Sequence, residues 1–80
     1  MYYVYMILCE DNTLYTGITT DPKRRLKEHK EGTGAKYTRA HGALEIVYLE
    51  EAPDRAEASK REAAIKKLSR EAKLKLIRDK

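Results

Sequence analysis

The opening of the chain constrains the fold more than any other segment. Two runs rich in Tyr, Val, Ile and Thr stand at Tyr2 to Leu8 and Leu14 to Thr19, with Asp11-Asn12 between them. Aromatic and β-branched residues favour extended strands, and a short polar connection between two such runs is typical of a hairpin. The first 19 residues therefore predict a β-hairpin.

The length of the hairpin loop decides which side chains share a face of the sheet. Successive residues of a strand point to opposite faces, so a slip of one residue turns every side chain over. A three-residue loop over residues 11–13 places Tyr5 and Tyr15 on the same face, whereas a two-residue turn separates them. We expect the longer loop and a shared face.

The remaining elements follow from cap residues, breakers and hydrophobic runs. In order, they are a helix begun by Thr20-Asp21-Pro22 and running to Gly32, an exposed loop from Gly32 to Gly42, a strand from Leu44 to Leu49, and a long helical stretch from Arg55. The pattern predicts one α+β domain over residues 1–80, with a three-stranded antiparallel or mixed sheet flanked by helices in the order β-β-α-β-α(-α).

The long helical stretch carries one apolar stripe with an interruption. The stripe consists of Ala58, Ile65, Leu68, Ala72 and Leu76. Helical periodicity puts these residues on one face, but it leaves Leu74 and Ile77 off the stripe. We therefore expect a break near Ser69, followed by a short final helix.

Composition narrows the class of protein. Eighty residues support one modest core, and 41% hydrophobic with 38% charged residues fits a folded domain better than a disordered or membrane-embedded chain. No basic residue precedes the apolar opening, so we expect a strand there and not a signal peptide or membrane span. The single cysteine, Cys9, excludes an internal disulfide and fits a buried thiol in a reducing compartment such as the cytoplasm. The net charge of +4 favours polyanionic partners.

Glu62 is conspicuous on the long helix. It lies four residues after Ala58 and three before Ile65, within about 60° of the centre of the apolar stripe. Burying an unpaired carboxylate costs several kcal/mol, so this side chain should be paired, placed at the edge of the stripe, or bound to a cation. The helix alone leaves these three readings open.

Arg25 and His29 lie four residues apart on the first helix. Leu26 is the single large apolar residue there, so the face toward the sheet should carry Leu26 with Arg25 and His29. A guanidinium and an imidazole aimed at one point suit a phosphodiester, because arginine offers a fork of donors and histidine can relay a proton. A solvated basic helix is the alternative reading.

The aromatic residues are all tyrosines. The chain has six Tyr and neither Phe nor Trp. A core filled only for packing would use phenylalanine, whereas each buried tyrosine needs a partner for its hydroxyl. We therefore expect some of the tyrosine hydroxyls to have a chemical role.

These residues together resemble the GIY-YIG nuclease family. Tyr3-Val4-Tyr5 stands where the family has Gly-Ile-Tyr, and Tyr15-Thr16-Gly17 where it has Tyr-Ile-Gly. Arg25, His29 and Glu62 stand where the family has its helical arginine, a histidine one turn later, and its metal-binding glutamate. The resemblance covers nearly the whole chain.

The resemblance is closest to the small one-domain bacterial and archaeal members, and it extends to the amino-terminal nuclease domain of the excision-repair endonuclease. The small members share Asp21 to Arg25 and Ala35 to Arg39 in addition to the triplets. Three positions depart from the wider family, and the first is Tyr3 in place of glycine. Ile18 replaces a lysine of some excision-repair members, and Leu74 stands near the place of an asparagine.

The resemblance implies a mechanism of phosphodiester hydrolysis. Glu62 would hold Mg²⁺ or Mn²⁺, and Tyr5 would take the proton of the attacking water. Arg25 would stabilise the phosphoryl oxygens, and Tyr15 would position the phosphate or water. The positive charge needed to ionise Tyr5 would come from the metal and Arg25, with His29 as a further available source. The expected substrate contacts are Gly17, where the missing side chain lets the backbone approach, with Lys36, Tyr37, Arg39 and His41 from the loop.

The substrate expected from this resemblance is nucleic acid, DNA in preference to RNA, recognised by structure and not by sequence. A DNA-repair nuclease is one form of that expectation. Two alternatives remain: a nucleic-acid-binding module that keeps the fold without turnover, and a protein-interaction adaptor in which Glu62, Arg25 and the tyrosines form a structural polar network.

Overall fold

Strand β1 (Tyr2–Cys9) is the centre of the fold. It pairs antiparallel with β2 (Leu14–Thr19) on one side and with β3 (Ala43–Ala52) on the other, giving the order β2-β1-β3. The computed structural model describes residues 1–79. The sheet is therefore wholly antiparallel, which decides between the two arrangements left open by the sequence.

The hairpin loop has the expected odd length but begins one residue earlier than predicted. The backbone N–H of Cys9 donates to the carbonyl of Thr13 at 2.9 Å, which leaves residues 10–12 as the loop. Asn12 ends it in the left-handed region, with φ of 68°. Because the loop length is odd, Tyr5 pairs with Gly17 and Ile7 with Tyr15, so Tyr5 and Tyr15 share a face as predicted.

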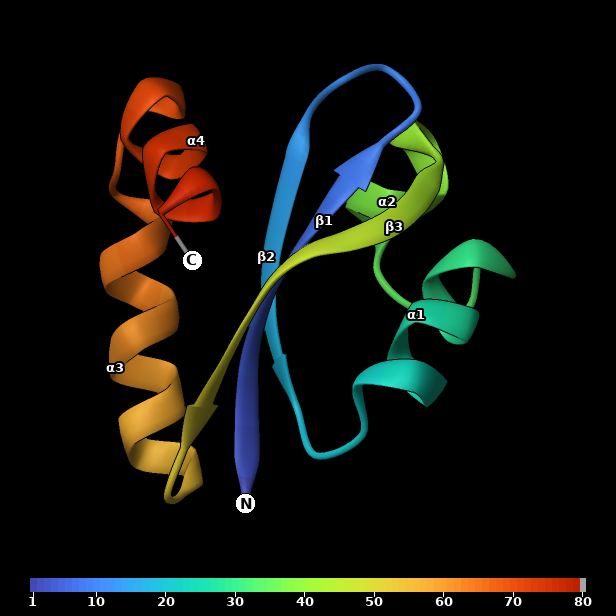
Figure 1. The fold of residues 1–80 in the computed structure, drawn as a ribbon. Helices are drawn as coiled ribbons and strands as arrows, with labels where there is room; N and C mark the ends of the chain where they lie inside the picture. Colours follow the sequence, from blue (N-terminus) through green and yellow to red (C-terminus); the bar gives the residue numbers. More distant parts are fainter. Residues whose placement is uncertain (80) are drawn as a thin grey trace.

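Four helices cover the sheet from both sides (Figure 1). Helices α1 (Pro22–Lys30) and α2 (Lys36–His41) lie on one face, and α3 (Arg55–Lys66) and α4 (Arg70–Arg78) on the other. Asp21, Asp54 and Ser69 each accept a hydrogen bond from a backbone N–H three residues later and so begin α1, α3 and α4. The predicted break near Ser69 is confirmed.

The two faces of β1 have separate cores. We call the first the apolar face; its buried residues are Val4, Met6, Tyr48, Ala52, Ala58 and Ile65. We call the second the tyrosine face; its buried residues are Tyr5, Ile7 and Cys9, with Tyr15, Leu26, Ala43, Ile46 and Leu49 packed against them. Leu26 therefore faces the sheet as predicted, and Cys9 is fully buried, which raises the pKa of its thiol.

Two expectations from the sequence are wrong. The segment from Gly32 to Gly42 contains α2 and is not simply a loop. Leu68 does not belong to the buried stripe, because α3 ends at Lys66 and Leu68 is 38% exposed, whereas Ile77 packs against the apolar face. Leu76, which lies beyond the break, does pack against the apolar face as the predicted stripe requires.

Candidate active site

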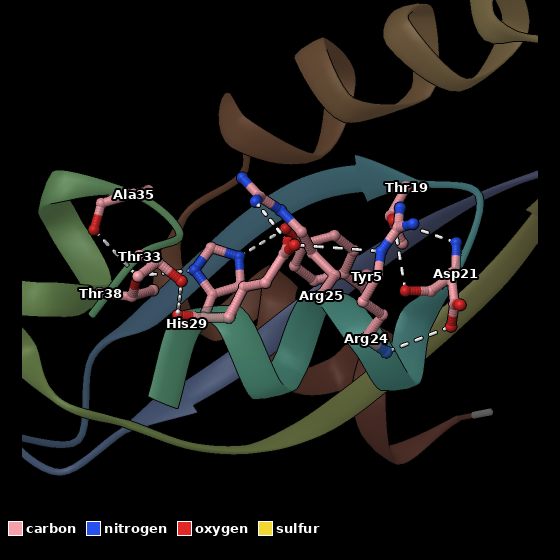
Figure 2. Close-up of polar contacts among 10 residues, drawn as sticks. Tyr5, Thr19, Asp21, Arg24, Arg25, His29, Thr33, Ala35 and Thr38 are labelled. Atoms are coloured by element: carbon pink, nitrogen blue, oxygen red, sulfur yellow. Dashed lines mark hydrogen bonds and ion pairs between the residues drawn. The ribbon is translucent and has the colours of Figure 1, made fainter. Parts of the chain in front are cut away.

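Tyr5 lies at the centre of the tyrosine face. Its side chain is 1% exposed, and its hydroxyl lies 2.8 Å from Nε2 of His29 (Figure 2). Gly17 faces it from β2. A Cβ atom on Gly17 would stand 2.5 Å from the Tyr5 hydroxyl oxygen and 2.7 Å from Cζ, so the phenol occupies the space that glycine leaves. Glycine at this position is explained by the placement of Tyr5, and a direct contact of Gly17 with substrate stays a prediction.

His29 links Tyr5 to helix α2. It is 1% exposed, and its Nδ1 lies 2.7 Å from the hydroxyl oxygen of Thr38, which is also 1% exposed (Figure 2). The Thr38 hydroxyl in turn donates to the carbonyl of Ala35 at 3.1 Å. The three side chains of Tyr5, His29 and Thr38 thus form one buried chain of hydrogen bonds across β1, α1 and α2.

The histidine in this chain is uncharged at neutral pH. Burial lowers the pKa of His29, and the positive charge of Arg25 lowers it further, although Glu28 acts in the opposite direction. The lowered pKa works against the expectation that His29 adds positive charge beside Tyr5. A neutral imidazole has one ring nitrogen free to accept, so His29 can instead receive a proton.

Tyr5 itself is held in its protonated form. Burial raises its pKa to about 12, the guanidinium of Arg25 within hydrogen-bonding reach lowers it, and repulsion from Tyr15 and Glu62 raises it again. The cation acts in the direction expected from the sequence, but desolvation outweighs it. In this state the Tyr5 hydroxyl has a proton to donate, and Nε2 of His29 is the atom that faces it.

Arg25 occupies the open rim of the tyrosine face. Its side chain is 30% exposed, and its NH1 donates to the carboxylate of Glu28 at 3.0 Å. That bond raises the pKa of the guanidinium. Because one part of the guanidinium is fixed by Glu28 and another reaches toward Tyr5, the group is oriented and still accessible to an anion.

Aromatic rings lead from the buried site to the surface. The ring centroid of Tyr15 lies 5.2 Å from that of His29, 6.4 Å from Tyr5 and 5.6 Å from Tyr37. Tyr37 stacks on His41 with centroids 4.1 Å apart, and Nδ1 of His41 pairs with the carboxylate of Asp11 in the hairpin loop. Tyr37 and His41 therefore join the predicted site through Tyr15, whereas Lys36 and Arg39 are exposed cations on α2.

Glu62 approaches the site from the other helical layer. On α3 it lies between the fully buried Ala58 and Ile65, with its side chain 23% exposed, and its carboxylate pairs with Lys66 at 3.3 Å. Its charge reaches Tyr5 as a weak repulsion. The sequence left three possibilities for Glu62, and the structure shows a side chain at the edge of the apolar stripe that is paired with a lysine.

A divalent cation fits this carboxylate only as a sparsely held ion. Among residues 1–79, no three or more His, Cys, Asp and Glu side chains are grouped to hold a metal. One partly exposed carboxylate matches a cation such as Mg²⁺, which keeps several waters and completes its shell with substrate oxygens. The Lys66 ammonium would first have to give up its place.

The structure brings Tyr5, Tyr15, Arg25 and His29 together on one face, with Glu62 near enough to act on Tyr5 by charge. Two residues of the same network were missed by sequence reasoning, Thr38 and Asp11. Thr38 lies in the segment Ala35 to Arg39, which resembles the small family members. A threonine among polar residues, however, does not indicate burial. Asp11 was read only as a turn residue.

The chain belongs to the GIY-YIG family, because the model of the GIY-YIG catalytic domain matches residues 1–75. This is a nuclease-type family. None of the helices within residues 1–79 combines the length and apolar character needed to cross a membrane.

The chain is similar to small proteins named UPF0213. One from Clostridium perfringens is 49% identical over 80 residues, covering 100% of this chain and 86% of the relative. One from the archaeon Natronomonas pharaonis is 47% identical over 78 residues, covering 98% and 92%. The solution structure of the UPF0213 protein BH0048 from Bacillus halodurans matches with a TM-score of 0.64 at 44% identity, covering 100% of this chain and 86% of that one.

Proposed function

We propose that this protein is a metal-dependent endonuclease that hydrolyses phosphodiester bonds in nucleic acid, DNA in preference to RNA, by structure and not by sequence. The observation that carries the proposal is the hydrogen bond between the buried Tyr5 hydroxyl and Nε2 of His29, whose pKa is lowered, beside the partly exposed guanidinium of Arg25. A buried tyrosine that only packs needs one hydrogen-bond partner for its hydroxyl, but not a proton acceptor and a cation together. A tyrosine that takes a proton from water needs both.

The proton path follows from this pair. Tyr5 is protonated at rest, so it can accept a proton from an attacking water only if its own proton moves to Nε2 of His29 at the same time. The imidazolium that forms then lies beside Arg25, which disfavours it. Negative charge brought by the phosphate offsets that repulsion, so bound substrate makes the transfer favourable.

Arg25 and Tyr15 hold the phosphate in this scheme. The exposed part of the Arg25 guanidinium can donate two parallel hydrogen bonds to the phosphoryl oxygens, where charge grows as water attacks. Tyr15, whose ring centroid lies 5.2 Å from that of His29, would position the phosphate or water. Both groups are fixed by packing before substrate arrives.

Glu62 would hold the Mg²⁺ or Mn²⁺ ion in this scheme, with Lys66 displaced. Such an ion, when bound, polarises the phosphoryl oxygens and lowers the pKa of nearby water. The support for this assignment is that Glu62 is partly exposed and that its charge acts on Tyr5.

In this scheme, helix α2 binds the parts of the nucleic acid that flank the scissile phosphate. Lys36 and Arg39 are exposed cations that can contact neighbouring phosphates, and Tyr37, stacked on His41, offers an aromatic surface to an unpaired base. Contacts of this kind neutralise phosphates without reading base edges. They support binding that falls steeply with salt and depends little on sequence.

The direct test is cleavage by the full chain of single-stranded, duplex and branched DNA and RNA with Mg²⁺, Mn²⁺ or EDTA. We expect cleavage with metal, none with EDTA, and none in Glu62→Gln, whose melting temperature should stay close to wild type because glutamine keeps the size and hydrogen bonding of the side chain. Glu57→Gln is the matched control, since Glu57 lies on the same helix with its side chain 53% exposed. Equal cleavage in wild type and Glu62→Gln would refute the assigned metal ligand.

One observation favours a second function, a nucleic-acid-binding module without turnover. The pKa of Tyr5 at about 12 opposes its use as a base unless His29 relieves it. A binding module and a nuclease share the salt-sensitive affinity, so only turnover separates them. Retained binding with no cleavage under any metal would establish the binding module.

A further inference from the structure

The segment between α1 and α2 holds His29 in a fixed orientation. A Cβ atom on Gly34 would lie 2.4 Å from Nδ1 of His29, so the ring packs directly on bare backbone. The backbone N–H groups of Thr33 and Gly34 both donate to the carbonyl of Glu28, at 2.9 and 3.1 Å. The backbone of residues 33 and 34, which packs beside the imidazole, is thus hydrogen-bonded to the C-terminal end of α1, the helix that carries His29.

The hydrogen bonds around the ring are consistent with one tautomer. The Thr38 hydroxyl has one proton, and that proton is donated to the carbonyl of Ala35. Toward His29 the same oxygen can therefore only accept, which requires a proton on Nδ1. A neutral ring protonated on Nδ1 has its lone pair on Nε2, the atom that faces the Tyr5 hydroxyl.

The opposite tautomer leaves buried groups without partners. With the proton on Nε2, Tyr5 would have to accept at that contact, and its own buried hydroxyl proton would lose its acceptor. Thr38 would have to turn its proton to Nδ1 and abandon Ala35. Buried polar groups are nearly always paired, so the arrangement with the proton on Nδ1 is the one the site favours.

We propose that Thr38 is a positioning residue that fixes the Nδ1–H tautomer of His29 and thereby aims the Nε2 lone pair at the Tyr5 hydroxyl. The role of this tautomer in cleavage rests on the proposed function, whereas the tautomer itself does not. Helix α2 then has two faces with different tasks. Its outer side presents Tyr37 and the cations, and its inner side sets the protonation pattern of the buried histidine.

The proposal is tested by long-range proton–nitrogen NMR correlation of the ¹⁵N-labelled full chain, at a pH above about 6.5, the pKa of a free imidazole. We expect His29 in wild type to show a protonated Nδ1 and an unprotonated Nε2. Thr38→Val keeps the shape but removes the acceptor, and should give a mixture or the opposite tautomer. Thr38→Ser should restore the wild-type pattern.

Thr33→Val is the matched control, because the exposed Thr33 hydroxyl donates to the Glu28 carbonyl and not to His29, and it should leave the tautomer unchanged. Wild-type His29 protonated on Nε2 overturns the proposal even if Thr38→Val fails to fold. So does an unchanged tautomer in a folded Thr38→Val.

Cleavage by the same variants links the tautomer to the proposed function. Loss of an orienting partner should slow cleavage about 10- to 100-fold in Thr38→Val, with recovery in Thr38→Ser. Full activity in a Thr38→Val protein with the wrong tautomer overturns the positioning role. If the wild-type protein shows the Nδ1–H tautomer but does not cleave any substrate, the nuclease proposal is refuted and the tautomer assignment is supported.

Discussion

The two faces of strand β1 are made by alternate residues of one segment, yet they solve different problems. Val4 and Met6 are buried among Ala58 and Ile65 on the apolar face, where contact is dispersion and exclusion of water. Tyr5, one residue away, is buried against an imidazole and a guanidinium on the tyrosine face. The period of two along a strand thus separates stability from chemistry within one short segment.

The two faces differ in how much the removal of a buried polar group destabilises the protein. On the tyrosine face each buried polar group depends on the next, from Tyr5 through His29 to Thr38, so a single deletion leaves an unpaired partner. On the apolar face a deletion at Val4, Met6 or Ile65 removes only packing, and Tyr48 is the exception because its hydroxyl donates to Glu50. Variants of neighbouring residues should therefore fail in different ways.

The largest expected effect is that of Tyr5→Phe on cleavage. Removing the hydroxyl removes the proton acceptor, so the rate should fall about 10²- to 10⁴-fold, while stability falls only about 1–3 kcal/mol from the unpaired Nε2 of His29. Tyr48→Phe is the matched control, a buried tyrosine on the apolar face. Single-turnover rates that drop equally in both variants would contradict a division between the faces.

Met6→Ala should show the reverse pattern. Met6 is fully buried next to Tyr5, and its truncation leaves a cavity that costs about 2–5 kcal/mol of unfolding free energy. Cleavage per folded molecule, measured well below the melting temperature, should stay within a few-fold of wild type. Urea denaturation gives the first quantity. A loss of rate as large as that of Tyr5→Phe would show that the faces are coupled.

Alkaline pH should destabilise the protein through the tyrosine face. The folded pKa of Tyr5 is about 12, above the value of 10.0 for a free phenol, so its contribution to stability is present below pH 10 and lost as the pH rises through 12. Two pKa units correspond to about 2.7 kcal/mol. The difference in unfolding free energy between wild type and Tyr5→Phe, measured from pH 9 to 12, should shrink by an amount of that order. A constant difference would mean that Tyr5 ionises equally in both states.

Gly17→Ala should disturb the tyrosine face by crowding. The added methyl falls on the Tyr5 phenol at 2.5 Å, and relief requires the ring to move off His29. We expect a cost of about 1–3 kcal/mol with a clear loss of cleavage. A variant with wild-type melting temperature and rate would show that Tyr5 has room the structure does not reveal.

Thr16→Val should be the mildest change, although Thr16 directly precedes Gly17 on β2. Its hydroxyl is buried toward the apolar face and has no hydrogen-bond partner within residues 1–79. Replacing it by a methyl removes an unpaired polar atom at constant volume, so stability should be unchanged or higher by up to about 1–3 kcal/mol. A marked loss of stability would reveal a partner for this hydroxyl.

The shared face of Tyr5 and Tyr15 could be predicted because strand alternation and an odd hairpin loop are local properties. The placement of Arg25 and His29 on the same side of α1 could be predicted for a similar reason, since four residues make about one helical turn. Helix α2 could not be predicted, because its six residues have no apolar period and are held by contacts of Thr38 and Tyr37 with distant elements. The raised pKa of Tyr5 in the free protein could not be predicted, since it depends on how far desolvation exceeds the effect of one cation.

The central position of β1 has a consequence for the order in which the chain acquires structure. Its pairing with β2 closes a loop of three residues, whereas its pairing with β3 joins Tyr2 to Ala52 across 49 intervening positions. During synthesis the hairpin can form early, but β1 keeps an unsatisfied edge until residues 43–52 emerge and close it. Such a distant pairing is the slow step in small domains of this kind. Until that closure, the segment bearing Tyr5 is an exposed apolar strand, and this is the interval in which the nascent chain is most prone to aggregate.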